Sequence, residues 1–242
     1  YNIINMGFNI LYPILILMID FDKMVENHLK RKPYQKPEGR YYPSQIGTCM
    51  RKVWYSYKFP RETQVDLQKI FHIGNIMHDL VVEILESDKN PHIELLQAEF
   101  PFREEIDDFM ISGRIDNLIL VKEDNKKVLI EVKSSSNIKY IETPPDYNIM
   151  QLQLYMHFTR IDDGILLYID KRNMKTKTFD FKYSVDDALK VIERFRLLHK
   201  HIKDSTIPKP ESRADEKNKW TCEHCEYRDK CYQETPEKSS TP

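Results

Sequence analysis

The chain has 242 residues, of which 40% are hydrophobic and 31% are charged, and its formal net charge is −1. This composition is typical of a globular protein and excludes a fibrous or wholly disordered chain. The balanced charge neither indicates nor excludes a nucleic-acid partner. Positive charge that could meet one is local, at Lys171-Arg172 and in the run from residue 28 to residue 36.

Residues 1–43 are expected to form an N-terminal extension and linker. Residues 8–19 are nearly all apolar, but the stretch is too short to span a bilayer and lacks the flanks of a signal peptide. We interpret it as an upstream extension or a start-site artefact, with a hydrophobic docking segment as the alternative. The polar residues 24–43 are expected to form a linker or surface arm. The protein is expected to be cytoplasmic and to have no membrane partner.

Two helices and a strand open the main domain, which we expect over residues 44–232. The first helix surrounds Cys49. The second covers residues 66–87, where apolar side chains recur at helical spacing and Asp66 is placed to cap the N-terminus. A strand is expected at residues 94–102.

Two hairpins are expected next, the first from residues 110–121 and 128–134 and the second from residues 164–170 and 175–183. Asp146 is placed to cap a helix that reaches about residue 158 and separates the two hairpins. Two hairpins on either side of a helix are typical of a mixed sheet.

The last long helix is expected to begin after Ser184, which with Asp187 resembles a capping box, and to reach residue 202. Residues 233–242 are rich in Ser, Thr, Pro and Glu and are expected to be disordered. The order of elements predicts an α/β domain with a mixed central sheet flanked by helices.

Two charges stand inside the apolar strand at residues 128–133. Because side chains alternate along a strand, Glu131 and Lys133 share one face, while Val128, Ile130 and Val132 share the other. If these charges are buried, they need partners or a metal ion. The alternative is a solvated face with a Glu–Lys pair of little energetic weight.

The preceding strand carries a further carboxylate, Asp116, which strand pairing could bring within reach of Glu131. Two carboxylates at one point form an oxygen-rich site suited to Mg²⁺ or Mn²⁺. A metal ion there polarises a phosphodiester and lowers the pKa of bound water. Lys133 is placed to orient that water or to stabilise the charge of the transition state. This pattern indicates phosphodiester hydrolysis.

Two other patterns admit a structural and a functional interpretation. His78 lies on the apolar stripe of its helix, where a histidine is usually part of the core. Gln151 and Tyr155 are one helical turn apart and share a face. An amide and a phenol presented together suit a nucleic-acid strand, and an ordinary polar face is the alternative.

The four cysteines form an uneven set. Cys222, Cys225 and Cys231 are closely spaced, and Cys49 is the one cysteine left to complete a four-thiolate site. With no export signal, metal ligation is favoured over disulfides. Four thiolates suit zinc or a [4Fe–4S] cluster, and His224 keeps a Cys₃His zinc site open.

These patterns together resemble the RecB-like branch of the PD-(D/E)XK nucleases. The matching motifs are Gly74-x3-His78, Gly113-Arg-Ile-Asp116, Glu131-Val-Lys133 and Gln151-x3-Tyr155. The resemblance implies that His78, Asp116 and Glu131 bind metal ions, together with the carbonyl of Val132. It also implies that Lys133 is catalytic and that Gln151 and Tyr155 lie near the DNA.

The cysteines around this core resemble those of the iron–sulfur nucleases, and among them the short CRISPR-associated "Cas four" family. The match includes the stretch from Ser44 to Arg51 and the closing cysteine cluster. It implies a [4Fe–4S] cluster held by the four cysteines. It further implies a preference for single-stranded DNA, 5′ to 3′ exonuclease action and prespacer trimming with the CRISPR integrase.

Other functions are compatible with the same residues. They are a stand-alone viral or archaeal recombination or repair nuclease, a restriction-type endonuclease, a non-catalytic iron–sulfur DNA-binding scaffold and a zinc-stabilised RNA-processing enzyme. The scaffold is disfavoured because a relic has no physical reason to keep Asp116, Glu131 and Lys133 together.

Overall fold

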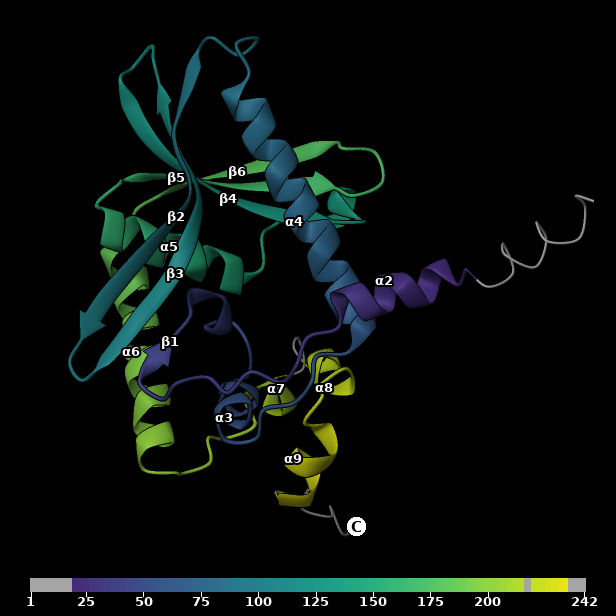
Figure 1. Cartoon of the computed structure of the whole chain (residues 1–242). Coiled ribbons are helices and arrows are strands. Elements are labelled where there is room, and N and C mark those ends of the chain that lie inside the picture. The colour runs from purple at the N-terminus through teal and green to yellow at the C-terminus, as the bar shows by residue number, and fades with distance from the viewer. Residues whose placement is uncertain (1–18, 216–218, 235–242) are drawn as a thin grey trace, which may run out of the picture.

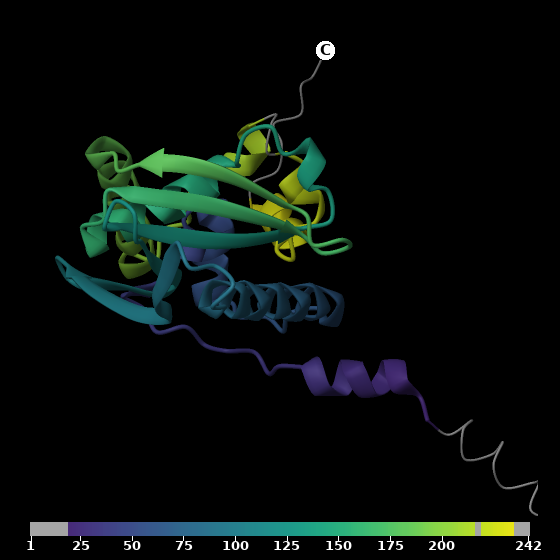
Figure 2. The same cartoon turned by 90° about the horizontal axis from the view of Figure 1, so that it is seen from above.

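The computed structural model describes residues 19–215 and 219–234 of the chain. Its central feature is a mixed sheet with helix α4 along one face and helix α5 against the other (Figures 1 and 2). The helices are α2 Phe21–Leu29, α3 Met50–Lys58, α4 Val65–Glu86, α5 Asp146–Thr159, α6 Val185–Lys203, α7 Glu211–Ala214, α8 Trp220–Glu223 and α9 Arg228–Glu234, with 3₁₀ turns η1 Pro43–Gln45 and η2 Ile138–Tyr140. The strands are β1 Arg40–Tyr41, β2 Ile93–Ile106, β3 Phe109–Val121, β4 Lys126–Ser135, β5 Asp163–Asp170 and β6 Thr176–Lys182.

The main path through the sheet has the strand order β1-β3-β4-β5-β6. Strand β2 lies off this path and pairs with β3. The pairs β3–β4 and β5–β6 are antiparallel, which confirms the two predicted hairpins. Strands β4 and β5 are parallel, and α5 forms the crossover between them. The fold is therefore the predicted α/β class with a mixed sheet.

The two faces of the sheet bury different side chains. On one face, Val128, Ile130 and Val132 of β4 form a cluster with Val81 and Leu85 of α4, which confirms that the three strand residues share a face. On the other face, apolar residues of β3, β4 and β5 pack against α5 through Ile115, Leu129, Leu152, Met156 and Leu166. Residues 128–132 are therefore buried, including the charged Glu131, and Lys133 is half-buried.

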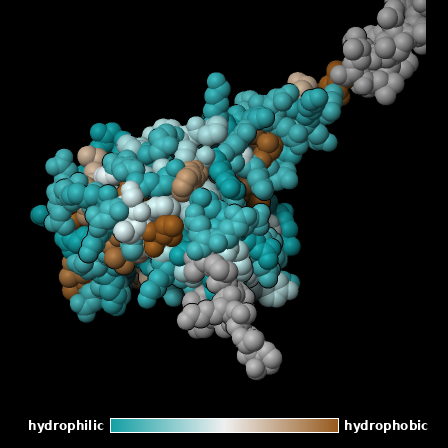
Figure 3. Space-filling view, turned by 90° about the horizontal axis from the view of Figure 1, so that it is seen from below, coloured by the Kyte–Doolittle hydropathy of each residue, from teal (hydrophilic) through white to brown (hydrophobic). Residues whose placement is uncertain are grey.

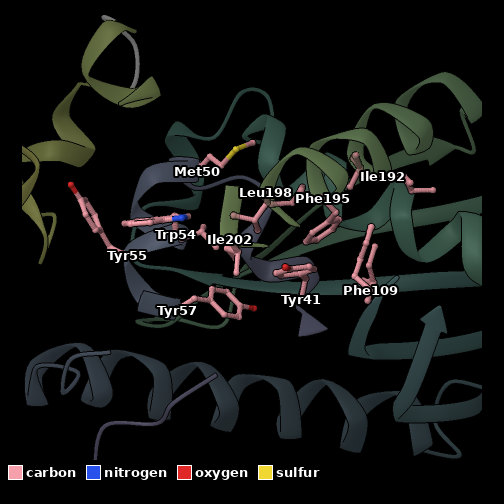
Figure 4. Close-up of a cluster of buried hydrophobic side chains, with 14 of the residues drawn as sticks. Tyr41, Met50, Trp54, Tyr55, Tyr57, Phe109, Ile192, Phe195, Leu198 and Ile202 are labelled. Atoms are coloured by element: carbon pink, nitrogen blue, oxygen red, sulfur yellow. The ribbon is translucent and has the colours of Figure 1, made fainter. Parts of the chain in front are cut away.

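A third, aromatic core joins α3 to α6 and to the C-terminal segment (Figure 4). Tyr55 of α3 stacks on Tyr227, with ring centroids 5.3 Å apart. The indole nitrogen of Trp54 donates to the carbonyl of His201 at 3.1 Å. Buried aromatic side chains therefore hold helix α3, which follows Cys49, against residues more than 140 positions later in the chain.

The expectation of a linker or surface arm over residues 24–43 is wrong in two places. Phe21–Leu29 forms a helix, which Asp20 caps by accepting from the amide of Lys23 at 2.9 Å. Tyr41 pairs within the sheet through β1 and is fully buried against Tyr57 and Phe109. The aromatic core extends further back along the chain than the polar composition of this segment indicated. Residues 1–18, with most of the apolar stretch, lie outside the described residues.

Several predicted element ends also need correction. Gln64, without a side-chain hydrogen bond, is the N-cap of α4, and Pro145 takes that position in α5, so neither Asp66 nor Asp146 is a cap. Ser184 does accept from the amide of Asp187, at 3.3 Å. Helix α9 continues to Glu234, where the sequence predicted a disordered tail from residue 233.

Within the described ranges, no helix has the length and apolar character needed to cross a membrane.

Replacing Tyr41 by Ala should lower the free energy of unfolding by about 3–5 kcal/mol, since it empties a fully buried aromatic site. Tyr34→Ala is the matched control, because the Tyr34 side chain is 64% exposed, and should change stability by less than about 0.5 kcal/mol. Chemical denaturation followed by tryptophan fluorescence measures both. Equal effects would show that Tyr41 does not belong to the folded core.

Candidate functional site

The motif residues from four elements, α4, β3, β4 and α5, meet where β3 and β4 separate. The two strands pair from Val121↔Lys126 to Asn117↔Ile130, and no further pair follows. Beyond that point a side chain takes over from the backbone, because Asp116 Oδ2 accepts from the amide of Val132 at 2.7 Å. Asp116 is thereby held against the backbone between Glu131 and Lys133, as the sequence predicted for the two strands.

Helix α4 brings His78 to the same point. His78 Nδ1 lies 3.5 Å from Asp116 Oδ1, so the two oxygens of this carboxylate serve different neighbours. Burial of the imidazole disfavours its protonated form, but Asp116, Glu131 and Glu99 outweigh this and raise the pKa of His78 above its ordinary value. His78 is thus a member of a polar site and not a purely apolar core histidine.

Glu131, Lys133 and α5 form a chain of hydrogen bonds. Lys133 Nζ donates to Glu131 Oε1 at 2.7 Å and to Gln151 Oε1 at 2.9 Å. Gln151 Nε2 in turn donates to the Tyr155 hydroxyl at 2.9 Å. The predicted i, i+4 pair on α5 is therefore close to the predicted strand residues.

The i, i+4 pair is buried, with Gln151 8% and Tyr155 3% exposed, so the polar surface face considered from sequence is wrong. In this arrangement Gln151 orients the ammonium group of Lys133, and Tyr155 orients the amide of Gln151. The predicted position of this pair near DNA stays a prediction.

The buried carboxylate of Glu131 is only partly hydrogen-bonded within the described residues. Glu131 is 2% exposed, and its Oε2 atom has no hydrogen-bond partner among the described residues. Burial, and then the charge of Asp116, raise the pKa of Glu131 to about 7, although Lys133 and His78 oppose the shift. Burial works against the charge of Lys133 as well, but Glu131 outweighs it and raises the pKa of the lysine. A buried carboxylate oxygen without a protein partner is suited to binding a cation.

One further carboxylate, Glu99 of β2, belongs to the site and was missed from sequence. Of the side chains in residues 19–215 and 219–234, His78, Glu99 and Asp116 form the one group of three or more metal-ligating side chains whose donor atoms lie within 4.8 Å of one another. The register of the long β2–β3 hairpin places Glu99 there, and it includes a shift between Leu95 and Gln97 that no sequence pattern announces.

The four cysteines, in contrast, surround an open cavity. Cys49, Cys222, Cys225 and Cys231 all line the same pocket of about 630 Å³, as does His224. Burial and the neighbouring thiols of Cys49 and Cys231 raise the pKa of Cys222. The structure therefore brings Cys49 to the C-terminal trio, as predicted.

The cysteine sulfurs are also spaced widely. No three of them share the 4.8 Å proximity of the His78 group within the described part of the chain. A tetrahedral zinc site, with Zn–S bonds of about 2.3 Å, requires sulfurs about 3.8 Å apart. Arg51 also donates to Cys231 Sγ at 3.7 Å, which adds positive charge beside the thiols.

Known proteins share this arrangement of elements. The curated CRISPR-associated exonuclease Cas4 of Saccharolobus solfataricus is 27% identical over 207 residues, which cover 84% of this chain and 91% of the relative. The crystal structure of SSO0001 matches with a TM-score of 0.57 and 22% identity, over 85% of this chain and 91% of that one. An alkaline exonuclease from Laribacter hongkongensis matches with a TM-score of 0.51 and 13% identity, over 69% and 90%. The two structures establish similarity of fold alone.

The sequence profile of the PD-(D/E)XK nuclease superfamily matches residues 21–232. The match includes β3, β4 and α5 with the carboxylates and the lysine that meet where the strands separate, and it confirms the family inferred from the motifs. On this evidence the chain belongs to the PD-(D/E)XK nuclease superfamily.

Proposed function

We propose that this protein is a metal-dependent DNA exonuclease that hydrolyses phosphodiester bonds at the site around Asp116 and Glu131. The observation that carries the proposal is the buried Glu131 Oε2, next to Asp116 and Lys133, which has no partner among the residues that the structure describes. Mg²⁺ or Mn²⁺ bound there supplies Lewis-acid stabilisation of the phosphodiester and lowers the pKa of water.

Each residue of the site has a role in this proposal. His78, Asp116 and Glu131 are the proposed ligands of the metal ions, together with the carbonyl of Val132. Lys133 orients the attacking water and stabilises negative charge on the phosphorus centre. Its ammonium group is suited to this because Glu131 and Gln151 fix it on two sides. Tyr155 supports Gln151 from within the core and keeps the lysine in one orientation.

Single-stranded DNA is the proposed substrate, degraded from 5′ to 3′. Tyr140, at the end of η2, is 71% exposed, and the Lys139 ammonium lies 4.6 Å from its ring centroid. Tyr147 is 48% exposed and lies one helical turn before Gln151 on α5. Exposed aromatic rings beside a cation suit stacking on unpaired bases. These residues support a single strand, and the polarity rests on the resemblance to the Cas four family.

A [4Fe–4S] cluster is the proposed occupant of the cysteine cavity. Four thiols around one cavity, wider than a zinc tetrahedron, support this assignment over zinc. The cluster would join the segment before α3 to the helices after α7, so that its main contribution is structural. The buried guanidinium of Arg51 would offset part of its negative charge.

The proposed context is prespacer trimming together with the CRISPR integrase. The name of the curated relative, a CRISPR-associated exonuclease, supports it. Much of the surface in Figure 3 is hydrophilic, with separate hydrophobic patches. The first half of α4 also exposes a group of large apolar side chains, which is typical of a protein-binding surface. They are Leu67, Ile70, Phe71, Ile73 and Ile76.

Lys133→Ala should lower the rate of DNA cleavage by about 100-fold or more, because it removes the ammonium group that donates to Glu131. The assay follows end-labelled single- and double-stranded DNA with anaerobically purified protein, in Mn²⁺ and in EDTA. Digestion that starts from a free 5′ end would identify the polarity.

Lys127→Ala is the matched control for this assay, since Lys127 lies on the same strand and is exposed. It should cleave like the wild type. If the Lys133 variant also cleaved like the wild type, or if folded, metal-supplied wild type did not cut DNA, the proposed mechanism would be rejected.

The cysteine site should contain iron and acid-labile sulfide in equal amounts and no stoichiometric zinc. Cys49→Ser should lose the iron and lower the thermal unfolding temperature, since it removes the ligand that joins the two ends of the domain. Thr48→Ser, at the neighbouring position, should retain both. Elemental analysis and circular dichroism measure the two properties, and a wild type loaded with one zinc ion would contradict the cluster.

A further inference from the structure

Glu99 lies directly across the hairpin from Asp116. Ala98 pairs with Asn117 and Phe100 pairs with Ile115, so the intervening residues, Glu99 and Asp116, face each other. The carboxylate is half-buried, and its Oε1 atom lies 3.8 Å from His78 Nδ1. Three side chains that can bind a divalent cation, two carboxylates and one imidazole, therefore converge from β2, β3 and α4.

The backbone at Glu99 is unusual for a strand. Its φ is +48°, in the left-handed region that non-glycine residues avoid. The other non-glycine residues with positive φ in the described part of the chain lie at turns or helix ends, at Asp107, Asn125, Arg160, Met174 and Ser205. Glu99 alone among these described residues has this conformation inside a strand, and the conformation belongs to the residue whose carboxylate meets His78 and Asp116.

The carboxylate oxygens of the site do not all have hydrogen-bond partners among the described residues. Asp116 Oδ2 accepts from the amide of Val132, so Oδ1 is the oxygen that faces His78. The nearby Glu131 Oε2 is buried and has no partner within the described residues. Two sets of donors thus share Asp116, one with Glu131 and an outer one with His78 and Glu99.

We propose that Glu99 is a cation ligand, and that His78, Glu99 and Asp116 bind a divalent metal ion at an outer position of the site. The inference rests on the proposed function for the identity of the site as a metal centre. It adds a carboxylate from β2 that none of the four sequence motifs contains.

A competing explanation is that Glu99 serves only as a partner for Arg114. Arg114 Nε lies 3.3 Å from Glu99 Oε2, but the arginine side chain is 71% exposed, so the pair is screened by water. The two explanations predict opposite effects of removing Arg114. If Glu99 is a cation ligand, Arg114→Gln should bind Mn²⁺ as tightly as the wild type or more tightly, because a neighbouring positive charge is removed. If Glu99 is only the ion-pair partner of Arg114, Arg114→Gln and Glu99→Gln should have the same effect on Mn²⁺ binding.

The test is a Mn²⁺ titration of the cluster-loaded protein without DNA, by calorimetry and by electron paramagnetic resonance of free Mn²⁺. Glu99→Gln should weaken one binding event by about 10- to 100-fold. Arg114→Gln should not weaken it. Glu105→Gln, which removes an exposed carboxylate from the same strand, is the charge-matched control and should bind like the wild type.

Glu99→Gly separates a metal ligand from a structural residue. Glycine adopts positive φ without strain, so this variant should keep or raise the thermal unfolding temperature while it loses Mn²⁺ affinity. A lower unfolding temperature with unchanged affinity would overturn the proposal, as would a Glu99→Gln isotherm that matches the wild type.

DNA cleavage by the same preparations distinguishes this inference from the proposed function. If the wild type cuts DNA and the Glu99 variants bind Mn²⁺ normally, only the role of Glu99 is refuted. If Glu99 variants lose Mn²⁺ affinity but the wild type cuts no DNA, the outer metal position stands and the nuclease proposal fails.

Discussion

The site depends on one hydrogen bond, in which the amide of Val132 donates to Asp116 Oδ2. Strands β3 and β4 stop pairing just before this point, and the carboxylate replaces the carbonyl that a continued ladder would supply. The bond satisfies a buried amide and also fixes one oxygen of Asp116, which leaves the other for His78. The end of the β3–β4 pairing and the position of the carboxylate therefore depend on the same hydrogen bond.

The charges beside this bond reflect a conflict between stability and function. Burying Glu131 and Lys133 costs solvation, and their mutual ion pair offsets only part of the cost, because Glu131 Oε2 has no partner among the described atoms. An apolar pair would fit the interior between α4 and α5 without this penalty. In the proposed function, the same low dielectric would strengthen the binding of a cation to the carboxylates and of a phosphate to Lys133, which a solvated pair could not provide.

The cysteine cavity and the catalytic region share their supporting elements. Gly47 lies against Tyr147 so closely that an added Cβ would sit 1.5 Å from the Tyr147 Cβ, and Cys49 follows two residues later. Tyr147 lies one turn before Gln151, which holds Lys133. The aromatic core then joins the helix after Cys49 to Tyr227 and α6. Helix α5 therefore lies against the segment before Cys49 and also carries the glutamine that binds Lys133.

The sequence by itself determined the sheet hairpins, the long helices and the approach of Asp116 to Glu131 and Lys133, because side-chain periodicity and local spacing encode them. Periodicity favoured a core position for His78, and its place beside Asp116 was expected through the resemblance to the RecB-like nucleases. Tertiary structure alone decided the rest. Glu99 joins the site through a register shift and a left-handed residue, and neither leaves a periodic signal. Gln151 and Tyr155 are polar yet buried, because Lys133 supplies a partner that is distant in sequence. Tyr41 lies in a polar segment but is buried by aromatic rings from β3, α3 and α6. Such contacts depend on long-range packing, which local patterns do not specify.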